Sequence, residues 1–170
     1  MQRSVRLIHH GVANPNRKLE VVIEAIRHLG NAYRLNLMLV NNNDAYYTQL
    51  PEQAAKTDNV RVIDPVAFDD ILPKINQCDT GIFLCEPSTF NLRHCMPNKF
   101  FEFIQARLAI AVGPSPGMAD FVKQHDLGIV SETFAPESMA KALREQATPE
   151  NPDRWRKNAD KSSVKVLQDI

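Results

Sequence analysis

The chain has 170 residues, in which 20 Lys and Arg residues balance 20 Asp and Glu residues, so its formal net charge is zero. A nucleic-acid surface would show as a basic excess, so no nucleic-acid partner is expected. The length suits a single domain over residues 1–170, and the hydrophobic content of 44% is ordinary for a globular protein. No run approaches the ~18 apolar residues of a membrane span, and the first apolar run is too short for a signal peptide. We therefore expect a cytoplasmic domain.

The three cysteines are Cys78, Cys85 and Cys95. They form no CxxC pair, and an odd number argues against a disulfide framework. No Cys and His residues cluster with the spacing of zinc ligands. We therefore expect three reduced thiols and no metal site.

Short apolar runs alternate with amphipathic stretches along the whole chain. The apolar runs predict six strands, at residues 5–10, 34–40, 60–63, 80–85, 109–113 and 127–130. The remaining stretches predict helices at residues 16–30, 44–55, 67–77, 97–108, 116–125, 136–147 and 152–168. This alternation predicts an α/β fold with a Rossmann-like, doubly wound parallel sheet of about six strands. Ligands of such sheets bind beyond the carboxyl ends of the strands, so the segments after the strands are the candidates for function.

The segment "HHGVANPNRK" (9–18) follows the first predicted strand. Gly11 permits close approach to the backbone, and Asn14 or Asn16 is expected to cap the next helix. Arg17 and Lys18 would then lie in the first turn, where the helix dipole disfavours cations. Either a bound phosphate resolves that conflict or both residues are solvated surface cations. The segment contains neither GxGxxG nor GxxxxGK[ST], the fingerprints of dinucleotide and P-loop sites.

The connection "CEPSTFNLRHCMPNK" (85–99) is long for an α/β unit. Long connections of this kind are binding loops, mobile lids or simple surface excursions. It leads into "PNKFFEFI" (97–104), which predicts a helix beside the carboxyl edge of the fourth strand. The core face of that helix is expected to carry Phe100, Phe101, Ile104 and Leu108. The opposite side carries Asn98, Lys99 and Glu102. Geometry alone says only that Glu102 is not a core residue, so it is either a solvated carboxylate or, because it follows the carboxyl edge of the fourth strand, a residue of the ligand cleft.

These segments in this order resemble a known family. "LIHHG", "NRKLEVVIEAI", "VRVIDPV", "PNKFFEFI", "ARLAIAVG" and "PSPGMADFV" together are similar to the C-terminal, nucleotide-sugar-binding domain of GT-B-fold retaining glycosyltransferases. The similar enzymes include many that build bacterial polysaccharides and lipopolysaccharides. The resemblance runs through essentially the whole chain, and "PNKFFEFI" is its most specific part.

The resemblance implies roles for individual residues. Glu102 matches the second glutamate of the family's E-x7-E motif, which accepts hydrogen bonds from the ribose hydroxyls. Arg17 and Lys18 fall near the basic pair that neutralises the leaving diphosphate, close to Gly11, which would make them the catalytic residues. Val66 falls where backbone groups read the base. The loop that holds the diphosphate and the sugar carries Asn91, Pro97, Asn98 and Lys99.

The sequence departs from the family at one position. The first glutamate of E-x7-E would fall at residue 94, which is His94 here. The contact with the transferred sugar is therefore open, and Glu86 is an alternative carboxylate if the loop is offset. His10 is expected to be a packed residue at the end of the first strand.

The chain therefore reads as the donor-binding half of a glycosyltransferase, with the N-terminal acceptor-binding domain expected outside it. The expected partner is a nucleotide sugar linked to UDP or GDP, with no cofactor and no metal, because basic side chains and helix dipoles stabilise the leaving group. Any membrane association is expected to be peripheral and to arise through the other half. Two alternatives stay open, a non-catalytic flavodoxin-like or receiver-like module and half of a sugar-nucleotide epimerase.

Overall fold

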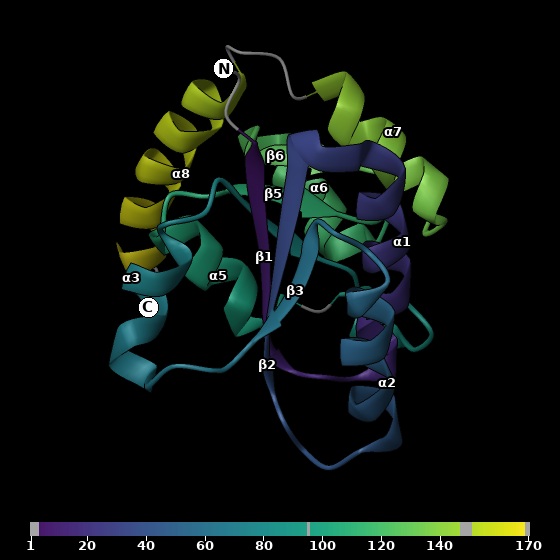
Figure 1. Cartoon of the computed structure of the whole chain (residues 1–170). Coiled ribbons are helices and arrows are strands. Elements are labelled where there is room, and N and C mark those ends of the chain that lie inside the picture. Colours follow the sequence, from purple (N-terminus) through teal and green to yellow (C-terminus); the bar gives the residue numbers. More distant parts are fainter. Residues whose placement is uncertain (1–3, 95, 147–150, 169–170) are drawn as a thin grey trace.

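The computed structural model describes residues 4–94, 96–146 and 151–168. Its centre is a sheet of six strands, all paired in parallel, in the order β3-β2-β1-β4-β5-β6 (Figure 1). The strands are β1 (Val5–Val12), β2 (Tyr33–Val40), β3 (Val60–Ile63), β4 (Thr80–Phe83), β5 (Ala109–Val112) and β6 (Gly128–Val130). The prediction of a doubly wound parallel α/β sheet is confirmed.

Helices cover both faces of the sheet (Figure 1). One face is packed by α1 (Leu19–Leu29), α2 (Ala45–Ala55) and α7 (Pro136–Gln146). The other face is packed by α3 (Ile71–Ile75), α5 (Asn98–Gln105) and α6 (Pro116–His125). The last helix, α8 (Asn151–Gln168), lies on the outside against α5, as predicted. Two hydrophobic cores result, one on each side of the sheet.

The entry into α1 differs from the prediction of one helix over 16–30. Residues Pro15–Arg17 form a short 3₁₀ helix, and Lys18 then takes a left-handed conformation with a φ of 50°. The left-handed residue breaks the helical path, so α1 begins at the buried Leu19. The backbone N–H of Leu19 donates to the Tyr46 hydroxyl at 2.9 Å, which satisfies one free donor of this helix end.

The core face of α5 also differs from the prediction. Phe100, Phe103 and Ile104 are fully buried, whereas Phe101 is only half-buried. Spacings of three and four residues place the first three on one side of the helix, and Phe101 lies at its border. The ring of Phe103 packs so closely on Gly81 of β4 that a side chain there would overlap it. This contact holds α5 against the sheet beside the carboxyl end of β4.

Several smaller boundaries shift. β1 extends two residues beyond the predicted strand, so Gly11 lies within the strand rather than after it. The fourth strand ends at Phe83, two residues early. The segment 67–77 is a 3₁₀ turn (Phe68–Asp70) followed by α3, and the long connection contains a helical turn, α4 (Phe90–Arg93). Within the described ranges, no helix is long and apolar enough to span a bilayer.

The predicted thiols are described in part. Cys78 and Cys85 are buried and form no disulfide, and Cys95 lies outside the described residues. Burial raises the pKa of the Cys78 thiol to about 11, so this group is protonated at neutral pH.

Candidate functional site

The strand order reverses between β1 and β4, which are neighbours in the sheet although their connections run in opposite directions. Their pairing covers Leu7 with Thr80 and Ile8 with Gly81, and both strands continue beyond it. The carbonyl of Ile82 in β4 accepts a hydrogen bond from Nδ1 of His9 in β1 at 3.2 Å. Ligands of open α/β sheets bind at such a switch point, beyond the carboxyl ends of the strands.

Lys99 reaches this point from the first turn of α5. Its side chain lies directly against Gly11, where a Cβ atom would overlap Cε and Nζ of Lys99. Gly11 has a φ of 120°, a conformation that side-chain-bearing residues rarely adopt. The group that approaches the backbone at Gly11 is thus the end of the Lys99 side chain, and the predicted contact of Gly11 with a bound anion stays a prediction.

Arg17 reaches the same point from the other side, out of the 3₁₀ helix before α1. Its guanidinium lies over the Phe83 ring, with Cζ 4.6 Å from the ring centroid. One guanidinium nitrogen lies 3.2 Å from Sγ of Cys85. Stacking on an aromatic ring is favourable for arginine and fixes the plane of the guanidinium. Arg17 is thus held at the ends of β1 and β4.

Lys18 lies beside Glu86, the third residue after β4. Its Nζ is 3.1 Å from Oε2 of Glu86, and both side chains are partly exposed. The backbone N–H of Glu86 also donates to the carbonyl of Asn16 at 3.3 Å. The prediction that Arg17 and Lys18 lie in the first turn of the helix is wrong, because both precede α1. The argument from the helix dipole therefore does not apply to them.

The charges of Lys99 and Arg17 act on one another. Burial lowers the pKa of the Lys99 ammonium, and the positive charge of Arg17 lowers it further, while Glu102 acts in the opposite direction. Two cations held near each other in a half-buried place favour a bound anion, which would relieve their repulsion. The sequence alone did not show that Lys99 is half-buried beside a second cation, Arg17.

Glu102 lies one helical turn after Lys99 on α5. Its Oε2 atom is 2.9 Å from Nε2 of His10, and the two side chains are 24% and 6% exposed. The angles between the atoms fall outside those of a hydrogen bond, and neither atom has another hydrogen-bond partner among the described residues. Burial raises the pKa of the Glu102 carboxyl, and Lys99 opposes that shift. Glu102 is therefore partly buried rather than freely solvated, and the expectation of a packed His10 is confirmed.

Both histidines of β1 are held in the neutral form by burial. Burial lowers the pKa of His9 to about 3, and the hydrogen bond to Ile82 opposes this only in part. Burial likewise lowers the pKa of His10 to about 4, with a further lowering by Lys99. Uncharged rings leave Arg17 and Lys99 as the cations next to them.

Four further predicted site residues remain to be placed. Pro97 precedes α5 in an extended conformation, and the exposed Asn98 is its first residue. Asn91 is exposed on α4. Val66 follows β3, two strands away from β1, and packs against the core on the α5 side. Among the described residues, no hydrogen bond or ion pair joins Val66 or Asn91 to Arg17, Lys18 or Lys99, so their roles stay predictions.

The two candidates for the missing glutamate lie in different surroundings. His94 is exposed at the end of α4, with its ring 4.7 Å from the Phe90 ring. Its backbone packs on Gly117 at the start of α6. Glu86 lies beside Lys18, at the carboxyl end of β4. Of these two residues, Glu86 is the one placed among the basic side chains.

Sequence reasoning missed three contributors to the site. Phe83 and Cys85 support Arg17, and His10 faces Glu102. A polar pair "HH" at the end of an otherwise apolar strand was the signal for His10. No local pattern in the sequence pointed to Phe83, because an aromatic residue in a strand is ordinary core.

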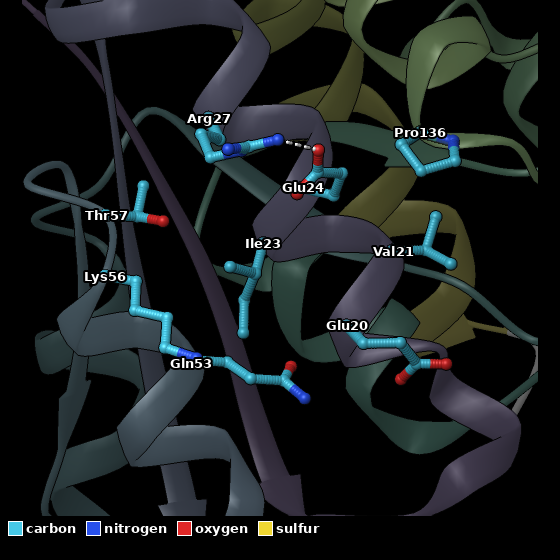
Figure 2. A pocket seen from close by; sticks show the side chains of 9 residues that line it. All are labelled: Glu20, Val21, Ile23, Glu24, Arg27, Gln53, Lys56, Thr57 and Pro136. Carbon is cyan, nitrogen blue, oxygen red and sulfur yellow. Dashed lines mark hydrogen bonds and ion pairs between the residues drawn. The ribbon is translucent and has the colours of Figure 1, made fainter.

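A hollow of about 480 Å³ lies elsewhere on the molecule, between α1 and the end of α2 (Figure 2). Its lining is mixed, with Val21 and Ile23 among charged side chains such as Glu24, Arg27 and Lys56. It lies over the α1 and α2 face of the sheet, so it is separate from the switch point. Among the described residues, no group of three or more His, Cys, Asp or Glu side chains is arranged to hold a metal.

An all-parallel sheet with helices on both faces and a switch point between β1 and β4 defines the class of open, doubly wound α/β domains. Residues 4–148 match the family model described as glycosyl transferases group 1. The chain therefore belongs to this glycosyltransferase family, which favours the glycosyltransferase interpretation over both alternatives. Comparison with curated proteins gave no match.

Solved structures of GT-B glycosyltransferases share the fold. WaaG, a glycosyltransferase involved in lipopolysaccharide biosynthesis, is 17% identical with a TM-score of 0.74, over 96% of this chain and 43% of that one. Anabaena Alr3699/HepE in complex with UDP-glucose is 15% identical with a TM-score of 0.74, over 97% of this chain and 44% of that one. The catalytic domain of cholesterol-α-glucosyltransferase from Helicobacter pylori is 12% identical with a TM-score of 0.72, over 95% of this chain and 98% of that one. The chain thus spans less than half of the first two structures.

Proposed function

We propose that this domain binds the donor of a glycosyltransferase, which transfers a sugar from a nucleoside-diphosphate sugar to a glycan or lipid-linked acceptor. The observation that carries the proposal is the convergence of Arg17 and Lys99 on the switch point, where burial and the charge of Arg17 lower the pKa of Lys99. A diphosphate is the anion whose two phosphates would meet both cations at once. Family membership supplies the reaction class.

The leaving diphosphate is the part of the donor that gains negative charge as the bond to the sugar breaks. Arg17, Lys18 and Lys99 would stabilise that charge, in the half-buried place where electrostatic interactions are strongest. The backbone at Gly11 would lie beside the phosphates. Asn91, Pro97 and Asn98 belong to the loop that would hold the diphosphate and the sugar. Leaving-group stabilisation by side chains alone, without a metal, stays a prediction.

Glu102 would bind the ribose. A carboxylate oxygen accepts hydrogen bonds from hydroxyl groups, and Glu102 lies one turn along α5 from the cation that would hold the phosphate. Backbone groups near Val66 would read the base.

The donor is proposed to be linked to UDP, with GDP as the second choice. Anabaena Alr3699/HepE was solved in complex with UDP-glucose and with UDP, and it shares the fold of this chain. Synthesis of a bacterial polysaccharide or cell-surface glycan, by a cytoplasmic or peripherally membrane-associated enzyme, is part of the proposal. It draws on the same resemblance and on the reported role of WaaG in lipopolysaccharide biosynthesis.

Calorimetric titration of the chain tests the proposal. We expect saturable binding of UDP or GDP, and at least tenfold weaker binding of the corresponding monophosphate, because the second phosphate meets another cation. Uridine without phosphate serves as the control and should bind weakest. No saturable binding of either diphosphate would overturn the proposal.

A further inference from the structure

We infer that His10 is a positioning residue for Glu102, which it holds in the orientation that binds the ribose; the inference rests on the proposed function. Nε2 of His10 and Oε2 of Glu102 are 2.9 Å apart, and both atoms are buried without another hydrogen-bond partner in the described part of the chain. A buried polar atom without a partner is costly, so a small turn of either side chain into a hydrogen bond is favourable.

The surroundings determine which atom donates. His10 is 5% exposed, lies edge-on against the Phe103 ring at 5.7 Å between centroids, and is uncharged at neutral pH. Burial raises the pKa of the Glu102 carboxyl, and Lys99, one turn earlier on α5, opposes that rise and so favours the carboxylate. A carboxylate only accepts hydrogen bonds, so the proton of the neutral ring belongs on Nε2. The pair is then a charge-assisted hydrogen bond from imidazole to carboxylate.

This pairing divides the carboxylate of Glu102 between two tasks. Oε2 is buried against the imidazole, and the side chain as a whole is 24% exposed, so Oε1 is the oxygen left for a ligand. One carboxylate oxygen accepts two hydrogen bonds, which is enough for both ribose hydroxyls. His10 does not touch the nucleotide in this arrangement. It acts through Glu102, from a rigid position near the end of β1.

His10 and Glu102 lie far apart in the sequence, so only the folded chain brings them together. His10 comes from β1 and Glu102 from α5, and the packing of the Phe103 ring on Gly81 fixes α5 beside the sheet. Loss of the imidazole would let Glu102 turn toward Lys99 or solvent. The expected consequence is weaker ribose recognition with unchanged recognition of the phosphates.

The test compares three variants of His10 by calorimetry with UDP and with 2′,3′-dideoxy-UDP. His10→Gln keeps an amide nitrogen near the position of Nε2 and should bind UDP within about threefold of the unmodified protein. His10→Asn places its amide near Nδ1, too far from Glu102, and should lose about tenfold, as should His10→Ala. With the dideoxy nucleotide all four proteins should bind equally, because the hydroxyl contact is absent. Thermal unfolding identifies any variant that does not fold, and the comparison of His10→Gln with His10→Asn stands without the alanine variant.

The outcomes separate this inference from the proposed function. Equal losses for UDP and the dideoxy nucleotide would show a merely structural role for His10 and overturn the inference. Unchanged UDP binding by folded His10→Asn would overturn it as well, while leaving donor binding intact. Absence of UDP and GDP binding by the unmodified protein would overturn the proposed function, and the inference with it.

Discussion

The ammonium of Lys99 lies against the backbone of Gly11, so closely that a Cβ atom on Gly11 would overlap Cε and Nζ of Lys99. The Gly11→Ala variant is therefore expected to displace Lys99, because the flexible end of a lysine moves more easily than a strand. UDP affinity should fall about tenfold through loss of this cation. The free energy of unfolding should fall by roughly 1–3 kcal/mol, because alanine is strained at a φ of 120°. Calorimetry and urea denaturation measure the two effects.

Gly30 provides the matched control for that variant. Its φ is 70°, and no heavy atom lies within 4 Å of a Cβ built on it. Gly30→Ala should therefore show backbone strain and a loss of stability, but unchanged UDP affinity. Equal affinities for the two variants would contradict the role assigned to Lys99.

Arg17→Ala is expected to weaken UDP binding by roughly 1–3 kcal/mol, the scale of a hydrogen bond to a charged group. The guanidinium is held by Phe83 and Cys85 at the ends of β1 and β4, where a diphosphate would bind. Lys123→Ala removes the same charge from an exposed position in the last turn of α6 and should leave binding unchanged. The difference between the two variants should persist at low salt; identical affinities there would remove Arg17 from the site.

Glu86→Gln is expected to raise UDP affinity by up to about fivefold. Glu86 is the partner of Lys18, and a bound diphosphate would compete with it for that ammonium. The effect is small because the pair is partly exposed, where ion pairs contribute about 1 kcal/mol or less. Calorimetry in low and high salt should show the gain shrinking as salt increases. A loss of affinity would instead place Glu86 in direct contact with the donor.

The stability of the fold is expected to depend on the two histidines of β1. The unfolded chain protonates both rings below about pH 6.5, whereas the folded chain does so only near pH 4 for His10 and pH 3 for His9. The unfolded state therefore binds more protons, and the free energy of unfolding falls as the pH decreases from 7 to 5. The loss is about 2 kcal/mol for each ring over that range.

The charged and titratable groups facing these rings are known. Lys99 and Glu102 face His10 from α5, and Lys99, Arg17 and His10 act on His9. Urea denaturation at pH 5, 6 and 7 measures the dependence. The His10→Gln variant should lose about half of the slope, because one of the two buried rings is removed. If the free energy of unfolding depended on pH with the same slope in both proteins, His10 would not be a buried neutral ring that charges on unfolding.

Much of the fold follows from the sequence because the strands are buried on both faces. Continuous apolar runs such as "RLNLMLV" have few other stable arrangements, and Gly30 ends α1 where its helical period stops. The position of Lys99 and Glu102 near the carboxyl edge followed from the order of strand, loop and helix. These features depend on local pattern and on chain order alone.

The remaining features depend on tertiary contacts. The left-handed Lys18 moves Arg17 out of α1, and nothing in "PNRK" distinguishes that path from a regular helix start. Phe101 and Phe103 lie on either side of the face that Phe100 and Ile104 form, so a small rotation of α5 decides which of them is buried. The close packing of Phe103 on Gly81 selects Phe103. The pairing of His10 with Glu102 joins residues far apart in the chain, so no local pattern predicts it.

The central claim is that Glu102 binds the ribose of a nucleoside diphosphate at the switch point between β1 and β4. Calorimetry of the unmodified protein and Glu102→Ala, each with UDP and with 2′,3′-dideoxy-UDP, tests it most directly. We predict that the mutation and the removal of the hydroxyls each cost about 2–4 kcal/mol, and that together they cost little more than either alone. Unfolding of Glu102→Ala should change by only about 1 kcal/mol, the cost of leaving Nε2 of His10 without its partner. Two losses that simply add would show that Glu102 does not contact the ribose and would contradict the account.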